Sequence, residues 1–83
     1  MRIPIDQLIC NRVNGTLVIL NPKVGVCYTL NSVGIDIWEG LLNNQNIESI
    51  ITSISEKYEQ DLSTIKDDVV ELIDDLREEG LIV

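Results

Sequence analysis

The dipeptide Asn14-Gly15 constrains the fold of this chain more than any other feature, because it is a strong short signal for a β-hairpin. A two-residue hairpin turn needs positive φ at both positions, which asparagine and glycine accept at low cost. The flanking segments, residues 7–13 and 16–20, are rich in strand-forming residues. A proline-containing turn at residues 21–23 then leads to a further candidate strand at residues 24–29. The sequence therefore predicts an antiparallel meander of three strands.

The rest of the chain has the apolar spacing of helices. The stretch 30–42 holds the only tryptophan and turns Asp36 and Glu39 away from its apolar face, as surface residues. Helix caps are expected at Asn31 or Ser32, at Asn46, and at Ser63 or Thr64. The three apolar stripes are Leu30, Val33, Ile37, Trp38 and Leu41; Ile47, Ile50, Ile51, Ile54 and Tyr58; and Ile65, Val69, Leu72 and Leu76.

Gly80 is placed to end the last helix in the left-handed conformation. Residues 81–83 are too apolar for a free tail, and we expect them to fold back on the core or to add a short strand. The element order is β-β-β-α-α-α in a single α+β domain spanning residues 1–83. A three-stranded meander leaves two edge strands, and a free edge can accept a strand from another chain or drive dimerisation.

The net negative charge of the chain limits the classes of macromolecule that it can bind. The net charge is −8, and residues 56–79 carry ten acidic side chains against Lys57, Lys66 and Arg77. This field repels phosphate backbones, so a basic or neutral peptide is a better partner than nucleic acid. A merely solvated helix face explains the same charges, and both interpretations stay open.

The residue inventory argues against an enzyme. The chain has no histidine, and Cys10 and Cys27 lack metal-ligand spacing, so we expect no metal, no cofactor and no histidine-based catalysis. The carboxylates between residues 67 and 75 lie on an exposed helix without a cleft to shift their pKa values. No signal peptide and no apolar run of about 20 residues is evident, which predicts a cytoplasmic chain with no membrane contact.

The last helix carries more apolar surface than one core stripe needs. Beside the stripe runs a second row, Lys66, Val70, Ile73 and Arg77. This row is either part of a wide core face or the wall of a groove. A groove wall beside a free strand edge would suit peptide binding by strand addition.

Three segments together resemble a known family. They are NGTLVIL, the run YTLNSVGIDIWEGL, and residues 47–83 from IESIITSISEKYEQ to EEGLIV. In order and separation they resemble PqqD-like domains, the precursor-peptide recognition elements of ribosomal peptide natural-product pathways. The resemblance implies a winged-helix-like fold that binds a precursor's leader segment as an added strand on the third strand, against the third helix. The binding residues it implies are Val24, Gly25, Val26, Cys27 and Tyr28 on the strand, with Lys66, Val70, Ile73, Asp74 and, for a leader cation, Asp67 on the helix.

The resemblance also implies partners. Single-domain relatives often serve lasso-peptide pathways, where they present the precursor to a cysteine-protease-like leader peptidase and to an ATP-using cyclase or another modifying enzyme. The chain's length, without a fused enzyme, favours that arrangement. Two alternatives remain: a winged-helix DNA binder, which the acidic third helix disfavours, and a regulatory subunit without a peptide ligand.

Overall fold

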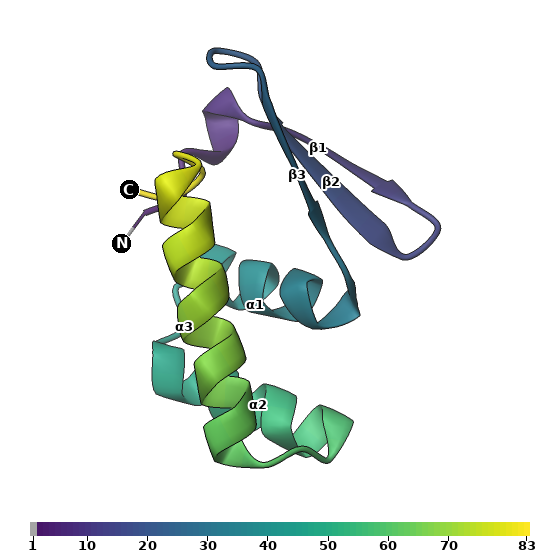
Figure 1. The fold of residues 1–83 in the computed structure, drawn as a ribbon, viewed down its shortest axis with the longest axis vertical. Coiled ribbons are helices and arrows are strands. Elements are labelled where there is room, and N and C mark those ends of the chain that lie inside the picture. The colour runs from purple at the N-terminus through teal and green to yellow at the C-terminus, as the bar shows by residue number, and fades with distance from the viewer. Residues whose placement is uncertain (1) are drawn as a thin grey trace.

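The computed structural model describes residues 2–83 and confirms the α+β architecture, with a three-stranded antiparallel sheet followed by three helices (Figure 1). Along the chain, the elements are a 3₁₀ turn at Ile5–Gln7, β1 (Ile9–Val13), β2 (Thr16–Asn21), β3 (Val26–Leu30), α1 (Ser32–Leu42), α2 (Ile47–Tyr58) and α3 (Leu62–Glu78). The sheet lies to one side of α3, and α1 runs below the sheet toward α2 (Figure 1). Within residues 2–83, no helix is long and apolar enough to cross a membrane.

The meander forms around the predicted hairpin. Asn14 and Gly15 take φ values of 51° and 78°, as a two-residue turn requires. The sheet order is β1-β2-β3, with Val13 opposite Thr16 and Leu17 opposite Leu30.

The third strand starts two residues later than predicted. Gly25 has a φ of 73° and donates its N–H to the carbonyl oxygen of Asn21 at 2.8 Å, so Val24 and Gly25 lie in the turn before β3. Val24 favours a strand by propensity, but the left-handed Gly25 closes the loop after it. A glycine within the predicted strand 24–29 would indicate a bulge or a close backbone approach, but Gly25 serves the turn instead.

Two predicted caps are present, and one helix start is wrong. The side chain of Asn31 accepts a hydrogen bond from the Gly34 N–H at 3.0 Å, and that of Asn46 accepts from the Ser49 N–H at 2.8 Å. α3 begins at Leu62 after Asp61, ahead of the expected Ser63 or Thr64. Aspartate has the same capping preference as serine, so composition did not separate the candidates.

The end of α3 turns the chain back into the core. Gly80 has a φ of 74°, the Gly80 N–H bonds the Arg77 carbonyl at 3.1 Å, and the Leu81 N–H bonds the Leu76 carbonyl at 2.8 Å. This is the Schellman arrangement, in which the residue after glycine packs on the last turn. Leu81 and Ile82 are buried, as expected of an apolar ending.

The backbones of Arg2 and Val83 pair with each other. The Arg2 N–H donates to the Val83 carbonyl at 2.6 Å, and the Val83 N–H donates to the Arg2 carbonyl at 2.7 Å. Pro4 cannot donate to a central strand ladder, so the sequence predicts an extended lead-in over residues 1–5. Met1 lies outside the described residues, and the 3₁₀ turn begins at Ile5.

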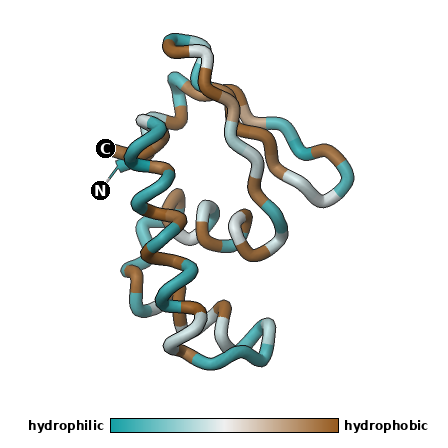
Figure 2. The backbone as a smooth tube through the Cα atoms, viewed as in Figure 1, coloured by the Kyte–Doolittle hydropathy of each residue, from teal (hydrophilic) through white to brown (hydrophobic). Residues whose placement is uncertain are grey.

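One apolar core joins the sheet to the helices. Apolar residues recur on all three strands and at intervals along α3 (Figure 2). Gly40 allows the closest helix approach, because a Cβ there would lie only 2.8 Å from Cγ1 of Ile50. The buried apolar side chains that form this core are Leu17, Ile19, Leu30, Ile35, Ile37, Trp38, Leu41, Ile50, Ile51, Ile54, Ile65, Val69, Ile73, Leu76, Leu81 and Ile82.

Candidate peptide-binding groove

β3 is an edge strand, and the register shows which of its backbone groups face outward. A two-residue turn makes Val13 and Thr16 a hydrogen-bonded pair. Because pairing alternates along β2, the next residue, Leu17, turns its backbone toward β3. The same alternation pairs every second residue of β3 with β2 and leaves the N–H and C=O groups of Cys27 and Thr29 directed to the free edge.

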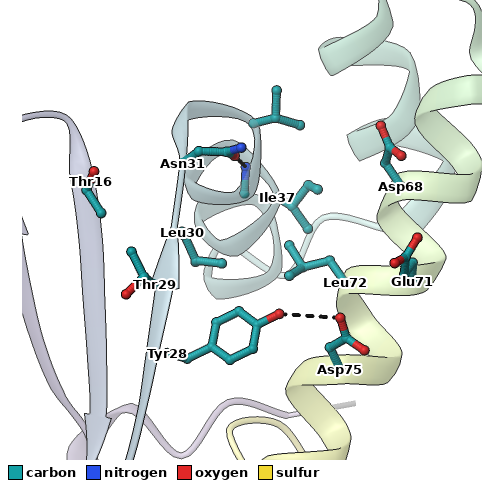
Figure 3. A pocket seen from close by; sticks show the side chains of 12 residues that line it. Thr16, Tyr28, Thr29, Leu30, Asn31, Ile37, Asp68, Glu71, Leu72 and Asp75 are labelled. Carbon is teal, nitrogen blue, oxygen red and sulfur yellow. Dashed lines mark hydrogen bonds between the residues drawn. The ribbon is translucent and has the colours of Figure 1, made fainter.

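Next to this edge lies a hollow of about 550 Å³, with β3 on one side, α3 on the other and the start of α1 as its floor (Figure 3). We call it the β3–α3 groove. Its lining combines apolar side chains on the floor with carboxylates on the helix wall. The lining residues are Thr16, Tyr28, Thr29, Leu30, Asn31, Val33, Gly34, Ile37, Asp68, Glu71, Leu72 and Asp75.

The helix wall follows from the periodicity of α3. Asp68, Glu71, Leu72 and Asp75 stand at i, i+3, i+4 and i+7, so they share one face of the helix. Leu72 is half-buried and packs against the core from the groove side. The wall is therefore an apolar side chain between carboxylates, and it can hold an apolar group while attracting a cation.

Tyr28 crosses the groove. Its hydroxyl donates to Oδ2 of Asp75 at 3.4 Å, a long hydrogen bond between β3 and α3 (Figure 3). Partial burial, together with the negative charges of Asp75, Glu79 and Glu71, raises the pKa of the Tyr28 phenol above its ordinary value. The phenol therefore stays protonated at neutral pH and remains a donor in an acidic groove.

The structure brings only some of the sequence-predicted strand residues to this groove. Val26, Cys27 and Tyr28 lie in β3, and Tyr28 lines the groove. Val24 and Gly25 lie in the preceding turn, with Val24 62% exposed.

The predicted helix residues lie on other faces of α3. Lys66, Asp67, Val70 and Asp74 line a second, shallow hollow, which shares only Glu71 and Asp75 with the β3–α3 groove. Ile73 is 5% exposed and belongs to the core, in agreement with the wide-core interpretation. The sequence reasoning missed the groove-wall role of Asp68, Glu71, Leu72 and Asp75. The one feature of the sequence that could have indicated this role is the position of these carboxylates beside Leu72 of the core stripe.

Asp36 and Glu39 are more than ordinary surface residues. Asp36 accepts hydrogen bonds from the Tyr58 hydroxyl at 2.5 Å and from Nζ of Lys57 at 3.0 Å, which ties α1 to α2. Partial burial alone would raise the pKa of Asp36, but these hydrogen bonds outweigh burial and hold its pKa below the usual value. Glu39 forms an ion pair with Arg12 of β1.

The free thiols are on the sheet. Cys27 is exposed on β3, and Cys10 is half-buried on β1, where burial raises the pKa of its thiol. A raised pKa keeps Cys10 in the protonated, weakly nucleophilic form at neutral pH.

A free strand edge that faces a helix across an apolar-floored groove combines backbone groups open to pairing with a pocket open to side chains, which are the two features that strand addition uses. The chain belongs to the PqqD family, because the model of that family, described as coenzyme PQQ synthesis protein D, matches residues 16–82. This match confirms the resemblance read from the sequence, and it spans both β3 and α3.

Among solved structures, the chain is similar to TbiB1 in complex with the TbiA(beta) leader peptide. The TM-score is 0.87 with 26% sequence identity, over 99% of this chain and 94% of that one. Comparison with proteins of curated function returns no match.

Proposed function

We propose that this chain is a non-catalytic adaptor that binds the leader segment of a ribosomally made precursor peptide. The observation that carries the proposal is the free edge of β3, which faces α3 across the β3–α3 groove. Membership of the PqqD family and similarity to TbiB1, solved with a leader peptide, support it.

In the proposed complex, the leader adds a fourth strand beside β3. Its backbone pairs with the outward N–H and C=O groups of Cys27 and Thr29, which supplies affinity largely independent of side chains. Side chains on the inner face of the added strand enter the groove toward Leu72 and the α1 floor. The partner enzymes, a leader peptidase and a cyclase or another modifying enzyme, then act on the presented precursor. Lasso-peptide biosynthesis is the pathway class that we propose.

Fluorescence anisotropy with the labelled leader of a precursor encoded beside this chain's gene tests the proposal. Leu72→Ala removes groove contacts and is expected to weaken binding about tenfold, as loss of a partly buried aliphatic group costs about 1.4 kcal/mol. Val70→Ala is the matched control, because Val70 is 45% exposed on another face of the same helix. It should change the Kd by less than about twofold, within the ±0.5 kcal/mol typical of surface substitutions.

Binding by the wild type weaker than about 100 μM, or roughly −5.5 kcal/mol, would contradict the proposal. Co-purification with a peptidase or cyclase without leader affinity would favour the regulatory-subunit alternative. Equal losses of affinity in Leu72→Ala and Val70→Ala would show that the binding site is not the β3–α3 groove. The DNA-binding alternative has no support, because α3 is strongly acidic.

A further inference from the structure

The two walls of the β3–α3 groove differ in charge. β3 (VCYTL) carries no charged residue, whereas α3 presents Asp68, Glu71 and Asp75 to the groove, with Glu79 one turn beyond Asp75. Glu79, like Glu71 and Asp75, contributes to the raised pKa of the Tyr28 phenol. The negative charges therefore gather along one wall, opposite an uncharged strand edge.

None of these carboxylates has a cationic partner within residues 2–83. The ion pairs of the described chain join Arg12 to Glu39, Lys57 to Asp36, and Arg77 to Asp74. Asp75 accepts a hydrogen bond from the neutral Tyr28, which leaves its charge uncompensated. The groove therefore has an apolar floor and an anionic wall that a cationic ligand could pair with.

The spacing of the carboxylates along the helix wall is close to the spacing of side chains on one face of a strand. Glu71, Asp75 and Glu79 follow one another at i, i+4 and i+8, which are steps of about 6 Å along a helix. Side chains on one face of a strand repeat every two residues, or about 6.7 Å. α3 runs alongside β3 in the opposite chain direction (Figure 1), so an added strand would pass the carboxylates in sequence.

The intervening side chains of an added strand would meet different surroundings. They would continue the outer face of the sheet, where Val18 and Leu20 are half-buried and Ile9 is 50% exposed. That face is mainly apolar, so it favours uncharged or apolar side chains at those positions.

From this geometry we infer the chemical class of the groove's occupant: an extended peptide with lysine or arginine at alternate positions and uncharged residues between them. The inference rests on the proposed function and adds the ligand's charge pattern. In this proposal, the aliphatic stems of the cations follow the apolar floor beside Leu72, and their charged ends reach Glu71 and Asp75 of the groove and Glu79 one turn beyond Asp75.

Three capped, labelled ten-residue peptides test the inference by anisotropy. The first has lysine at three alternate positions with valine and threonine between them. The second is an isomer with its three lysines contiguous, and the third has glutamate at the lysine positions. The wild type is expected to bind the alternating peptide most tightly, and its advantage should shrink with added salt, because exposed ion pairs are screened.

Two matched protein variants distinguish the effect of charges at the groove from the effect of the overall negative charge of α3. The groove variant is Glu71→Gln/Asp75→Asn/Glu79→Gln, and it should bind the alternating peptide about tenfold more weakly, since three exposed ion pairs are lost. The control variant is Asp67→Asn/Asp74→Asn/Glu78→Gln, which removes the same charge from other faces of α3 and should cost less than about threefold.

Equal losses in the two variants, or equal binding of the alternating and contiguous isomers, would overturn the inference. So would the absence of wild-type binding to the alternating peptide. A precursor leader that binds the wild type and the groove variant equally would overturn this inference and leave the proposed function standing. A wild type that binds no precursor leader would overturn the proposed function itself.

Discussion

The two edge strands of the sheet, β1 and β3, offer the same backbone chemistry in different surroundings. On the β1 side, the ion pair between Arg12 and Glu39 ties the strand to α1. On the β3 side, the strand is separated from α3 by a groove of about 550 Å³, crossed by the long hydrogen bond from Tyr28 to Asp75. Both strands have outward N–H and C=O groups, but only β3 faces a helix wall across open space.

The difference shows that a free edge alone does not define a peptide-binding site. Any edge strand can pair with another chain, which is a hazard as well as an opportunity. Specific recognition also needs side-chain pockets beside the edge. In the proposed complex, α3 supplies such a pocket beside β3, because Leu72 and its flanking carboxylates line the groove next to that strand.

A proline placed on each edge strand in turn tests which edge the leader uses. Thr29 on β3 and Arg12 on β1 both direct their N–H outward, so proline at either position spares the pairing with β2. Thr29→Pro is expected to weaken leader binding about 30-fold, or by about 2 kcal/mol, since it removes one hydrogen bond and places a ring at the edge. Anisotropy with the precursor leader measures this effect.

Arg12→Pro is the control for that experiment, and the Kd should stay within about twofold of the wild type, because an exposed ion pair contributes little. Thermal denaturation of both variants verifies that they remain folded. If the two prolines weaken binding equally, the leader does not distinguish the edges, and the assignment to β3 is wrong.

Two asparagine caps, one at the groove and one away from it, should contribute alike to the free energy of unfolding. Asn31 caps α1 at the groove, and Asn46 caps α2 away from it. Replacing either by alanine should lower the free energy of unfolding by about 1 kcal/mol, measured by urea denaturation. Only Asn31→Ala should also alter the Kd for the leader, by about twofold, because Asn31 lines the groove. An unchanged stability in either variant would show that the cap contributes nothing.

The smallest expected effect is on the ionisation of Tyr28. In a Tyr58→Phe background, absorbance titration of the remaining tyrosine should give a pKa above the ordinary value of 10.0, and Asp75→Asn should bring that pKa down. A raised folded-state pKa means that the stabilisation from Tyr28 is full below pH 10 and is lost as the pH rises through the folded-state pKa. If Asp75→Asn leaves the titration midpoint of Tyr28 unchanged, Asp75 is not a cause of the raised pKa.

Features set by neighbouring residues were predictable from the sequence. The Asn14-Gly15 turn and the caps at Asn31 and Asn46 depend on local backbone preferences, and the structure has all three. The start of β3 was placed too early, because Val24 has strand propensity, whereas the positive φ of Gly25 is fixed by loop closure.

The helix residues predicted to bind the peptide line a hollow beside the β3–α3 groove and not the groove itself, and their role in binding stays a prediction. The rotation of α3 about its axis depends on how the whole core packs, and Ile73 turns into that core. This rotation brings Leu72, counted as part of the core stripe, to the groove, and leaves Val70 on another face. Periodicity shows which residues share a face but not which neighbour that face meets.

The pairing of Arg2 with Val83 has a consequence for protein engineering. The backbones of Arg2 and Val83 are hydrogen-bonded to each other, so a short linker could join the chain at these two residues with little rearrangement. New ends could then be opened at the exposed Asn14-Gly15 turn, which lies between β1 and β2 and away from the β3–α3 groove. A circular permutant of this kind would change the order in which the strands are synthesised while keeping β3 beside α3.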